Sequence, residues 1–175
     1  MNIENVTTWA TVSGVVISIA ALIIETRRSR AAHQVDLILN FENRFLAEDM
    51  QKKRRMASEF LKNYRSLDTG DARWGKVSDV VDFFQTLGTF AKSGHVNIEL
   101  IYKFFYYWLS HYWSACQTYI EKTRSQSSIT WEDAAWLHAR LRAYDRRHNA
   151  GALSNINSAQ LDSFFEWELE NLASQ

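Results

Sequence analysis

The sequence predicts an all-α protein: an N-terminal transmembrane helix followed by a cytoplasmic helical bundle of about four to five helices. Three observations support this prediction. The chain of 175 residues contains no proline and only six glycines, so few residues in it interrupt a helix. Its apolar residues recur three and four positions apart, without the alternation typical of strands. Near its N-terminus lies a long uncharged run, followed at once by arginines.

The uncharged run extends over residues 7–24. Its 18 residues would form about 27 Å of helix, close to the ~30 Å thickness of the hydrocarbon core of a bilayer. A cleaved signal peptide carries its positive charge before the apolar segment, whereas here the basic residues follow it. A buried core helix is the remaining alternative, because five hydroxyl side chains lie within the run. The basic residues that flank the run are Arg27, Arg28 and Arg30.

The position of these arginines also predicts an orientation. Basic residues are retained on the cytoplasmic side of a membrane segment. We therefore expect a short extracytoplasmic tail at residues 1–6, a transmembrane helix at 7–25 and a cytoplasmic helical domain at 26–175. The expected location is the bacterial inner membrane, with the N-terminus outside and the C-terminus in the cytoplasm.

The cytoplasmic part divides at a few polar breaks. Helical spacing continues to a loop at residues 68–75, and a helix capped by Ser78 then ends at Gly94, after Lys92. Asn97 starts the next helix, which extends from Ile98 to about Arg124. This helix is aromatic on every side, which is typical of the buried centre of a bundle.

Two further helices follow. Thr130 and Asp133 resemble a capping box that starts a helix to about His148. The last helix begins near Asn157.

Composition excludes several classes of function. Twenty basic and twenty acidic residues leave no net charge, so the chain as a whole has no general affinity for nucleic acid. The single cysteine, Cys116, rules out an intrachain disulfide and is read as a small core residue. No phosphate loop, nucleophile elbow or zinc motif occurs in the sequence. We therefore expect no catalytic residues, no metal and no cofactor.

Small and polar residues form a heptad stripe along the predicted membrane helix. Their spacings of three and four favour a left-handed parallel bundle, and small residues and hydroxyls promote packing between helices in lipid. Four or more copies, with a tetramer as the best estimate, would line a pore with hydroxyls and a ring of carboxylates. Ordinary membrane tethers also contain such residues, so a simple tether remains the alternative. The stripe consists of Thr7, Thr11, Gly14, Ser18, Ala21 and Glu25.

Two basic clusters are candidate sites for an anion. Such runs are usually solvated helix faces, but arginine pairs well with phosphate and carboxylate groups. A lipid headgroup or a nucleotide-type regulator would fit them, and a soluble anion fits the first cluster better because it lies far along the helix from the membrane. The clusters are Lys52, Lys53, Arg54 and Arg55, and Arg140, Arg142, Arg146 and Arg147.

One pair of residues supports an enzymatic alternative. Arg142 and His148, six positions apart, resemble the Arg and His pair of helical ribonucleases of the HEPN type. That resemblance implies action on RNA phosphodiesters. The polar residue that normally follows the arginine in that family is missing, and a solvated basic helix end stabilised by the helix dipole is the preferred interpretation of the pair.

Residues 82–113, DFFQTLGTFAKSGHVNIELIYKFFYYWLSHYW, resemble a bacterial family of unknown function that combines an N-terminal hydrophobic helix with a cytosolic helical module. The organisation is also similar to that of the channel effectors of anti-phage systems of the Hailong type. This similarity implies a homo-oligomeric membrane channel controlled by a nucleotide or oligonucleotide from a partner enzyme. A single-pass tether that recruits a protein is the second hypothesis, and a membrane-anchored ribonuclease the third. The residues that carry the resemblance are Phe84, Leu87, Gly88, Gly94, Trp108 and Trp113.

Overall fold

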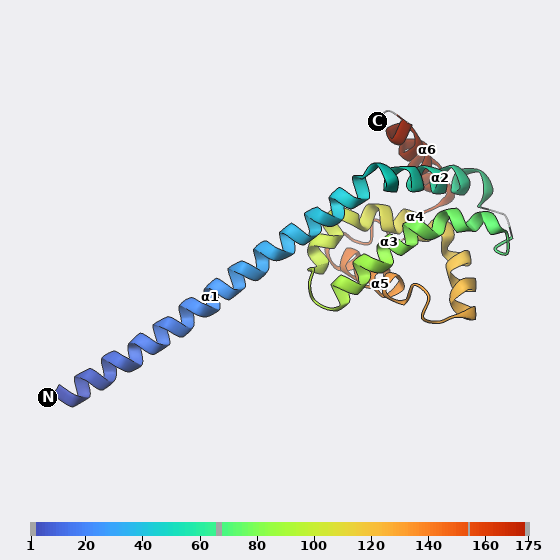
Figure 1. Cartoon of the computed structure of the whole chain (residues 1–175). Coiled ribbons are helices and arrows are strands. Elements are labelled where there is room, and N and C mark those ends of the chain that lie inside the picture. Colours follow the sequence, from blue (N-terminus) through green and yellow to red (C-terminus); the bar gives the residue numbers. More distant parts are fainter. Residues whose placement is uncertain (1–2, 66–67, 154, 174–175) are drawn as a thin grey trace. The chain divides into compact units, whose positions relative to one another are not determined.

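The computed structural model describes the backbone of residues 3–65, 68–153 and 155–173, and side chains from Ala21 to Leu172 within these ranges. These ranges form six α-helices and a 3₁₀ turn, with no strand, which confirms the all-α prediction (Figure 1). The elements are α1 (Ile3–Leu46), α2 (Glu48–Tyr64), η1 (Ala72–Trp74), α3 (Gly75–Lys92), α4 (Ile98–Gln126), α5 (Glu132–His148) and α6 (Ser158–Ala173).

The chain separates into two units between Leu37 and Ile38. The first contains only the beginning of α1. Its apolar side chains nearest the arginines are solvent-exposed: Leu22 by 68%, Ile23 by 48% and Ile24 by 54%. Among the residues that the structure describes, no helix combines the length and the apolar character of a membrane span. Most side chains of the predicted span, residues 7–25, lie outside that description.

The second unit contains one more helical segment than predicted. The sequence predicted helix up to residue 67, either continuous with the predicted span or following it after a kink, but α1 continues past the span and ends at Leu46. Ala47 has an extended backbone, with φ −65° and ψ 147°, and α2 starts at Glu48. Two acidic residues in the first turn of α2 favour a helix start here. The end of α1 and helices α2 to α6 therefore form the bundle, and the prediction of four to five helices was one too low.

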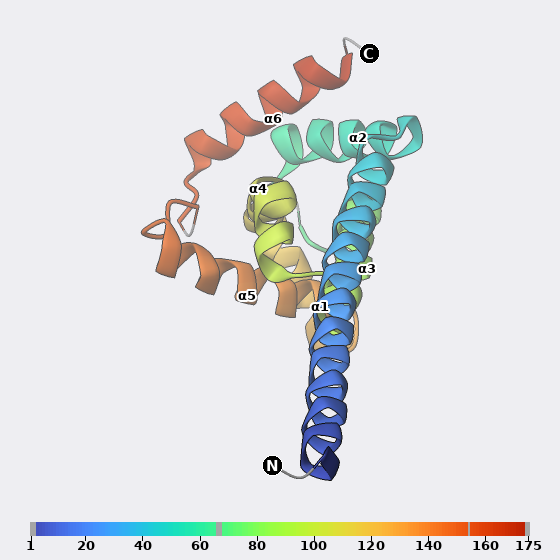
Figure 2. The same ribbon diagram turned by 90° about the vertical axis from the view of Figure 1, so that its left-hand side faces the viewer.

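The bundle is arranged around α4. Helices α2 and α6 pack together on one side of α4 and α5 lies on the other, where it also packs against α3 (Figure 2). Phe45 of α1 is 1% exposed. Its ring lies 4.9 Å from that of Phe83 in α3 and 5.6 Å from that of Phe105 in α4. Edge-to-face and tilted contacts of this kind add to the stabilisation from burial alone.

The prediction for α4 is confirmed in its main point. One face of this helix is fully buried, including Tyr106 and Tyr112 at 1% exposure each. Cys116 is also buried, as expected of a core residue, and burial raises the pKa of its thiol. However, the helix is not buried on every side, because Tyr107 is 42% exposed.

Both ends of α3 can be compared with the sequence. Ser78 does not cap the helix, because Asp71 caps η1 by accepting a hydrogen bond from the Arg73 amide and the chain continues directly into α3 at Gly75. The predicted end is confirmed. Gly94 adopts φ +77°, and the amide of His95 donates to the carbonyl of Phe90, closing a Schellman-type turn.

The predicted capping box of α5 is wrong. The residue before the helix is Trp131, with φ 52° and no capping side chain. The carboxylate of Asp133 instead accepts hydrogen bonds from Thr89 and Lys92 of α3. Gln85 of α3 accepts the hydrogen bond of the Ala134 amide. Groups on a neighbouring helix therefore replace the local cap.

The start of α6 agrees with the prediction. The side chain of Asn157 accepts a hydrogen bond from the Gln160 amide, and the side chain of Gln160 accepts one from the Asn157 amide, each at 2.9 Å. This reciprocal pair satisfies two backbone donors at the helix start.

Candidate functional site

The first basic cluster is neutralised by neighbouring carboxylates. Lys52 lies 2.8 Å from Glu48 and Arg55 lies 3.3 Å from Glu59. Lys53 lies between two carboxylates, with Asp49 at 3.0 Å. All are exposed pairs of the kind that contribute about 0–1 kcal/mol each. Their effect here is to cancel the positive charge of this face of α2.

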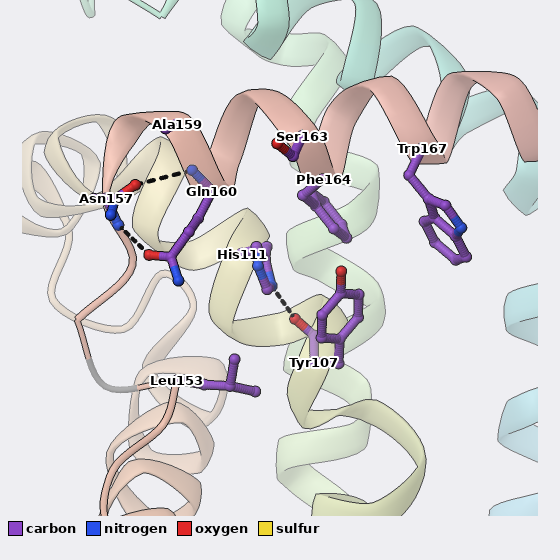
Figure 3. Close-up of a pocket in the computed structure, with 9 residues that line it drawn as sticks. All are labelled: Tyr107, His111, Leu153, Asn157, Ala159, Gln160, Ser163, Phe164 and Trp167. Atoms are coloured by element: carbon purple, nitrogen blue, oxygen red, sulfur yellow. Dashed lines mark hydrogen bonds between the residues drawn. The ribbon is translucent and has the colours of Figure 1, made fainter.

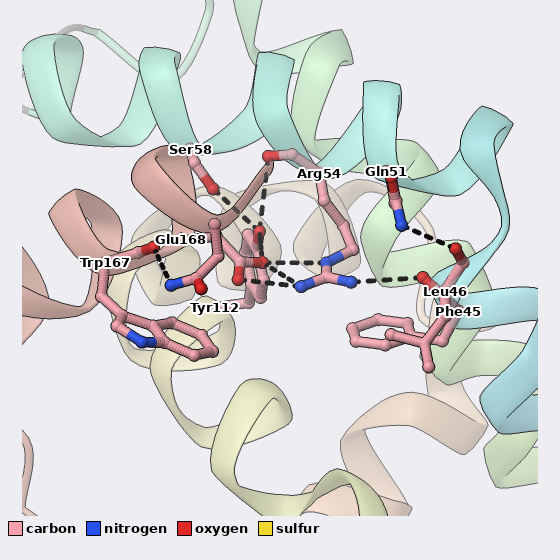
Figure 4. A network of polar contacts seen from close by, with 9 residues as sticks. Phe45, Leu46, Gln51, Arg54, Ser58, Tyr112, Trp167 and Glu168 are labelled. Atoms are coloured by element: carbon pink, nitrogen blue, oxygen red, sulfur yellow. Dashed lines mark hydrogen bonds and ion pairs between the residues drawn. The ribbon is translucent and has the colours of Figure 1, made fainter. Parts of the chain in front are cut away.

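The fourth member of that cluster lies in the interior. Arg54 is 3% exposed and forms two parallel hydrogen bonds of 2.8 Å with the fully buried carboxylate of Glu168 on α6 (Figure 4). Its guanidinium also donates to the Phe45 carbonyl and lies 4.1 Å from the centre of the Phe45 ring. The structure therefore separates Arg54 from its three neighbours in the sequence and pairs its charge internally.

Two hydroxyl groups complete this network. Tyr112 of α4 donates to Glu168 at 3.0 Å and lies 2.9 Å from the hydroxyl of Ser58. Burial, and then the nearby Glu168 carboxylate, raise the pKa of Tyr112 well above its ordinary value, so the phenol remains a donor. The network joins α1, α2, α4 and α6 at one point, and it is a structural element of the bundle.

The second basic cluster differs from the first. Within the described ranges, none of its four arginines has a carboxylate at ion-pair distance. The four do not share one face of α5. Arg140 and Arg147 lie two turns apart on one side, together with Tyr144, whereas Arg142 and Arg146 lie on another.

Arg140, Tyr144 and Arg147 line a pocket of about 280 Å³ between α5 and the first turn of α4. The α4 side of this pocket contains Asn97 and Glu99. Asn97 caps the helix by accepting the Glu99 amide at 2.9 Å. The positive end of the α4 dipole therefore faces the same space as two arginines.

The charge of Glu99 is compensated within the pocket wall. Its carboxylate accepts a hydrogen bond of 2.6 Å from Lys103, one turn further along α4. This hydrogen bond and the charge of Lys103 lower the pKa of Glu99, and His148 contributes in the same direction. The carboxylate is thus ionised and already paired, while the arginine side of the pocket is not.

The two residues of the ribonuclease resemblance do not converge. Six positions along a helix place Arg142 and His148 about 120° apart around its axis. His148 stacks on Tyr144 with ring centres 4.0 Å apart, and its Nδ1 lies 2.9 Å from the Tyr144 carbonyl. Arg142 lies instead near His138, whose pKa falls to about 4 because of burial and then the charge of Arg142. His138 stacks on Trp113 with ring centres 4.8 Å apart.

A larger and more open pocket lies between α4 and α6 (Figure 3). Its volume is about 540 Å³. His111, stacked on Phe164 at 4.4 Å between ring centres, forms part of the wall. Burial lowers the pKa of His111. Tyr107 and Trp167 present exposed aromatic rings at its edge, 42% and 44% accessible.

The residues predicted to line a pore are only partly described. The side chains of Thr7, Thr11, Gly14 and Ser18 lie outside the described residues, as noted above for the span. Ala21 and Glu25 are exposed, as are the flanking Arg27, Arg28 and Arg30. In the described part of the chain, no group of His, Cys, Asp and Glu side chains could hold a metal ion.

Sequence reasoning missed residues that complete these sites. Tyr144 lies at the position between Arg140 and Arg147 that shares their helix face, a spacing visible in the sequence. Asn97 was recognised as a helix start but not as part of a pocket, because only the fold brings α4 beside α5. Glu168 gave no signal at all among the acidic residues of the last helix.

A family model described as a domain of unknown function (DUF4760) matches residues 8–141. The match covers most of the chain, from the uncharged run to the middle of α5, and the chain therefore belongs to this family. Neither a curated protein nor a solved structure matches it.

Proposed function

We propose that this member of the DUF4760 family is an oligomeric, channel-like or membrane-perturbing effector of the bacterial inner membrane, controlled by an anionic, nucleotide-type ligand at its cytoplasmic helical domain. The observation that carries this proposal is the exposure of the described apolar residues Leu22, Ile23 and Ile24 at the end of a long uncharged run, directly before a band of arginines. Leu22, the most exposed of its described apolar residues, is 68% accessible. A role in anti-phage defence follows from the resemblance in organisation to Hailong-type effectors.

Membrane insertion would give the exposed side chains of Leu22, Ile23 and Ile24 an apolar environment. Burying a leucine or isoleucine is worth roughly 1.5–3 kcal/mol, and the run contains many such residues. Lipid would cover them, while Arg27, Arg28 and Arg30 would lie among the headgroups on the cytoplasmic side. The described residues beyond Leu37 contain a buried apolar core of their own.

Self-association is supported by the stripe of small and polar residues. In lipid, helices associate where backbones can approach closely and hydroxyls can form hydrogen bonds. Gly14 and Ser18 provide these properties on the stripe, and Glu25 would place a carboxylate at its cytoplasmic end. Several copies around an axis would form a narrow polar path for cations.

Control by an anion is supported by the unequal charge balance of the helical domain. The whole chain has no net charge, yet arginines without a carboxylate partner among the described residues gather on α5, while the cations of α2 are paired. Two of the unpaired arginines line a pocket. Charge of this kind at a concave site favours an anionic ligand.

A membrane tether is the second candidate, and the pocket between α4 and α6 favours it. Exposed aromatic rings such as those of Tyr107 and Trp167 are typical of protein interaction sites. A tether would hold its partner there without conducting ions. Truncation of Trp167 to alanine would then abolish recruitment of the partner and leave the membrane potential unchanged.

The test combines topology with membrane potential in bacterial cells. Asn5→Cys should react with an impermeant thiol reagent from the periplasmic side, whereas the buried Cys116 should not react. Expression of the wild-type chain should depolarise the membrane, as reported by a potential-sensitive dye. Recovery of the full-length protein in the soluble fraction without detergent would refute the membrane assignment, and normal polarisation in the presence of inserted protein and ligand would leave the tether.

A further inference from the structure

The side of α5 that faces the first turn of α4 presents three polar side chains whose donors have no partner among the described residues. The guanidinium groups of Arg140 and Arg147 and the hydroxyl of Tyr144 line one pocket. Within the described ranges none of them has a hydrogen-bond or ion-pair partner. Their spacing of four and three residues along α5 places them in one row on the helix surface.

Glu99, the one carboxylate residue among those that line this pocket, already has a cationic partner. Glu99 is held by Lys103 at 2.6 Å, and the buried Asp145 of α5 accepts a hydrogen bond of 2.7 Å from Tyr102. Arg140 and Arg147 therefore form no ion pair with a carboxylate of the described residues. An incoming ligand rich in acceptor oxygens would satisfy three donors at once.

We infer that this pocket binds a small ligand bearing at least two phosphate groups, and that Arg140, Tyr144 and Arg147 hold those groups. The inference names the site and the chemical class of the regulator, and it rests on the ligand response proposed above. It does not depend on the pore.

Size and spacing support this class. A volume of about 280 Å³ lies just below the ~300–1,000 Å³ typical of small-molecule sites, which suits a compact ligand and not a polymer. The two arginines begin about 10.5 Å apart along the helix axis. Their long side chains can converge on adjacent phosphates. At this spacing, a ligand with two anionic groups can contact both arginines, whereas a single carboxylate would contact only one of them well.

The α4 side of the pocket adds to the attraction. Phosphate groups bind readily at helix N-termini because the dipole there is positive. Asn97 already satisfies the Glu99 amide, so the arginines carry the site and the helix end assists them. Ala143, between the two arginines, contributes only a methyl group to the wall and leaves the space open.

The experiment uses the full-length protein purified in detergent and measures binding by calorimetry. The probes are inorganic pyrophosphate, ATP, citrate and dioctanoyl phosphatidic acid. Pyrophosphate and ATP should bind, and Arg140→Gln or Arg147→Gln should each weaken binding by about tenfold or more, as expected for the loss of one charge-assisted hydrogen bond. Tyr144→Phe should produce a smaller loss.

Two control variants make the test specific. Arg44→Gln removes an exposed arginine from α1 and should leave binding unchanged. Arg146→Gln removes an arginine of the same cluster from the other side of α5, and it should alter binding much less than Arg140→Gln does. Thermal melting of every variant in the absence of ligand should match the wild type, because the substituted side chains are exposed or without partners.

Several results would overturn the inference. These are the absence of pyrophosphate and ATP binding, an equal loss in Arg146→Gln and Arg140→Gln, or citrate binding as tight as that of pyrophosphate. Tighter binding of phosphatidic acid than of pyrophosphate, with the same dependence on Arg140, would also overturn it, because that lipid carries a single phosphate, and would assign the pocket to a lipid headgroup. Binding without ion conductance would retain the site and refute the pore, whereas conductance without binding would do the reverse.

Discussion

Residues on the two sides of Leu37 differ in what covers their apolar side chains. Beyond this point, Phe45, Tyr112 and Phe165 are at most 1% exposed within one shared core. Before it, Leu22 and Ile24 remain 68% and 54% exposed. The described buried core therefore lies beyond Leu37, although Ile129 is 76% exposed there. None of the described side chains from residue 21 to residue 37 is buried. Tests of stability should therefore address the helical bundle, and tests of location and conductance should address the N-terminal segment.

The largest effect on the bundle is expected from Glu168→Ala. This change leaves Arg54 buried without its partner, and removing one member of a buried pair typically costs about 3–5 kcal/mol. Denaturant unfolding of the full-length protein in detergent measures the loss. Glu166→Ala is the matched control on the same helix, because Glu166 forms an exposed pair with Lys62 at 3.0 Å. Equal effects of both variants would show that the buried network does not hold α6 on the bundle.

The next largest effect is expected from Gly88→Ala. A Cβ atom at this position would lie 2.3 Å from the backbone carbonyl oxygen of Asp133, so α3 and α5 would have to move apart. Overpacking of this kind typically costs about 1–3 kcal/mol. Gly75→Ala provides the control, since a Cβ there would meet nothing within 4 Å and alanine favours the helix. A stable Gly88→Ala variant would contradict the close approach of the two helices.

Acid should destabilise the bundle through His138. Its pKa in the folded protein is about 4, below the ~6.5 of an unfolded histidine. The unfolded chain therefore binds more protons between these values, and stability that is fully present above pH 6.5 is lost as the pH falls toward 4. The loss at pH 5 relative to pH 8 should be about 2 kcal/mol for this residue. His138→Gln should lack this part of the pH dependence, and an unchanged profile would place the titration elsewhere.

The smallest expected effect on stability is that of Leu22→Cys, which tests the exposed segment. A fluorescent probe on this cysteine should be quenched by brominated lipids, because lipid covers the residue in the proposed arrangement. Cys116 should remain unlabelled because it is 1% exposed. Unfolding of the bundle should be unaffected. Quenching by aqueous iodide instead of lipid would place residue 22 in water and contradict membrane insertion.

Local sequence signals predicted the elements whose ends depend on their own residues. The Gly94 turn and the Asn157 start are examples, because their partners lie within a few positions. The sequence failed where distant groups decide the structure. Thr130 does not cap α5, since Gln85 and Thr89 of α3 supply the partners there.

The candidate site divides in the same way. The arginines of α5 were visible as a cluster, but which of them share a pocket depends on the packing of α4 beside α5. Arg54 was indistinguishable from its neighbours in the sequence, and only its helix face and the position of Glu168 make it an interior residue. The contact between Arg54 and Glu168 joins residues 114 positions apart, and no local sequence pattern indicates it.

The most direct test of the central claim measures ion flux in proteoliposomes that contain the purified full-length chain. The wild type, in the presence of pyrophosphate or ATP, should conduct, and so should Ile19→Leu and Ile23→Leu, which lie off the stripe and keep the surface apolar. Gly14→Leu and Ser18→Leu should lose most of the flux, because leucine prevents close packing of the helices and removes a hydroxyl from the seam. Equal flux from all four variants, or no flux from the wild type, would contradict the pore.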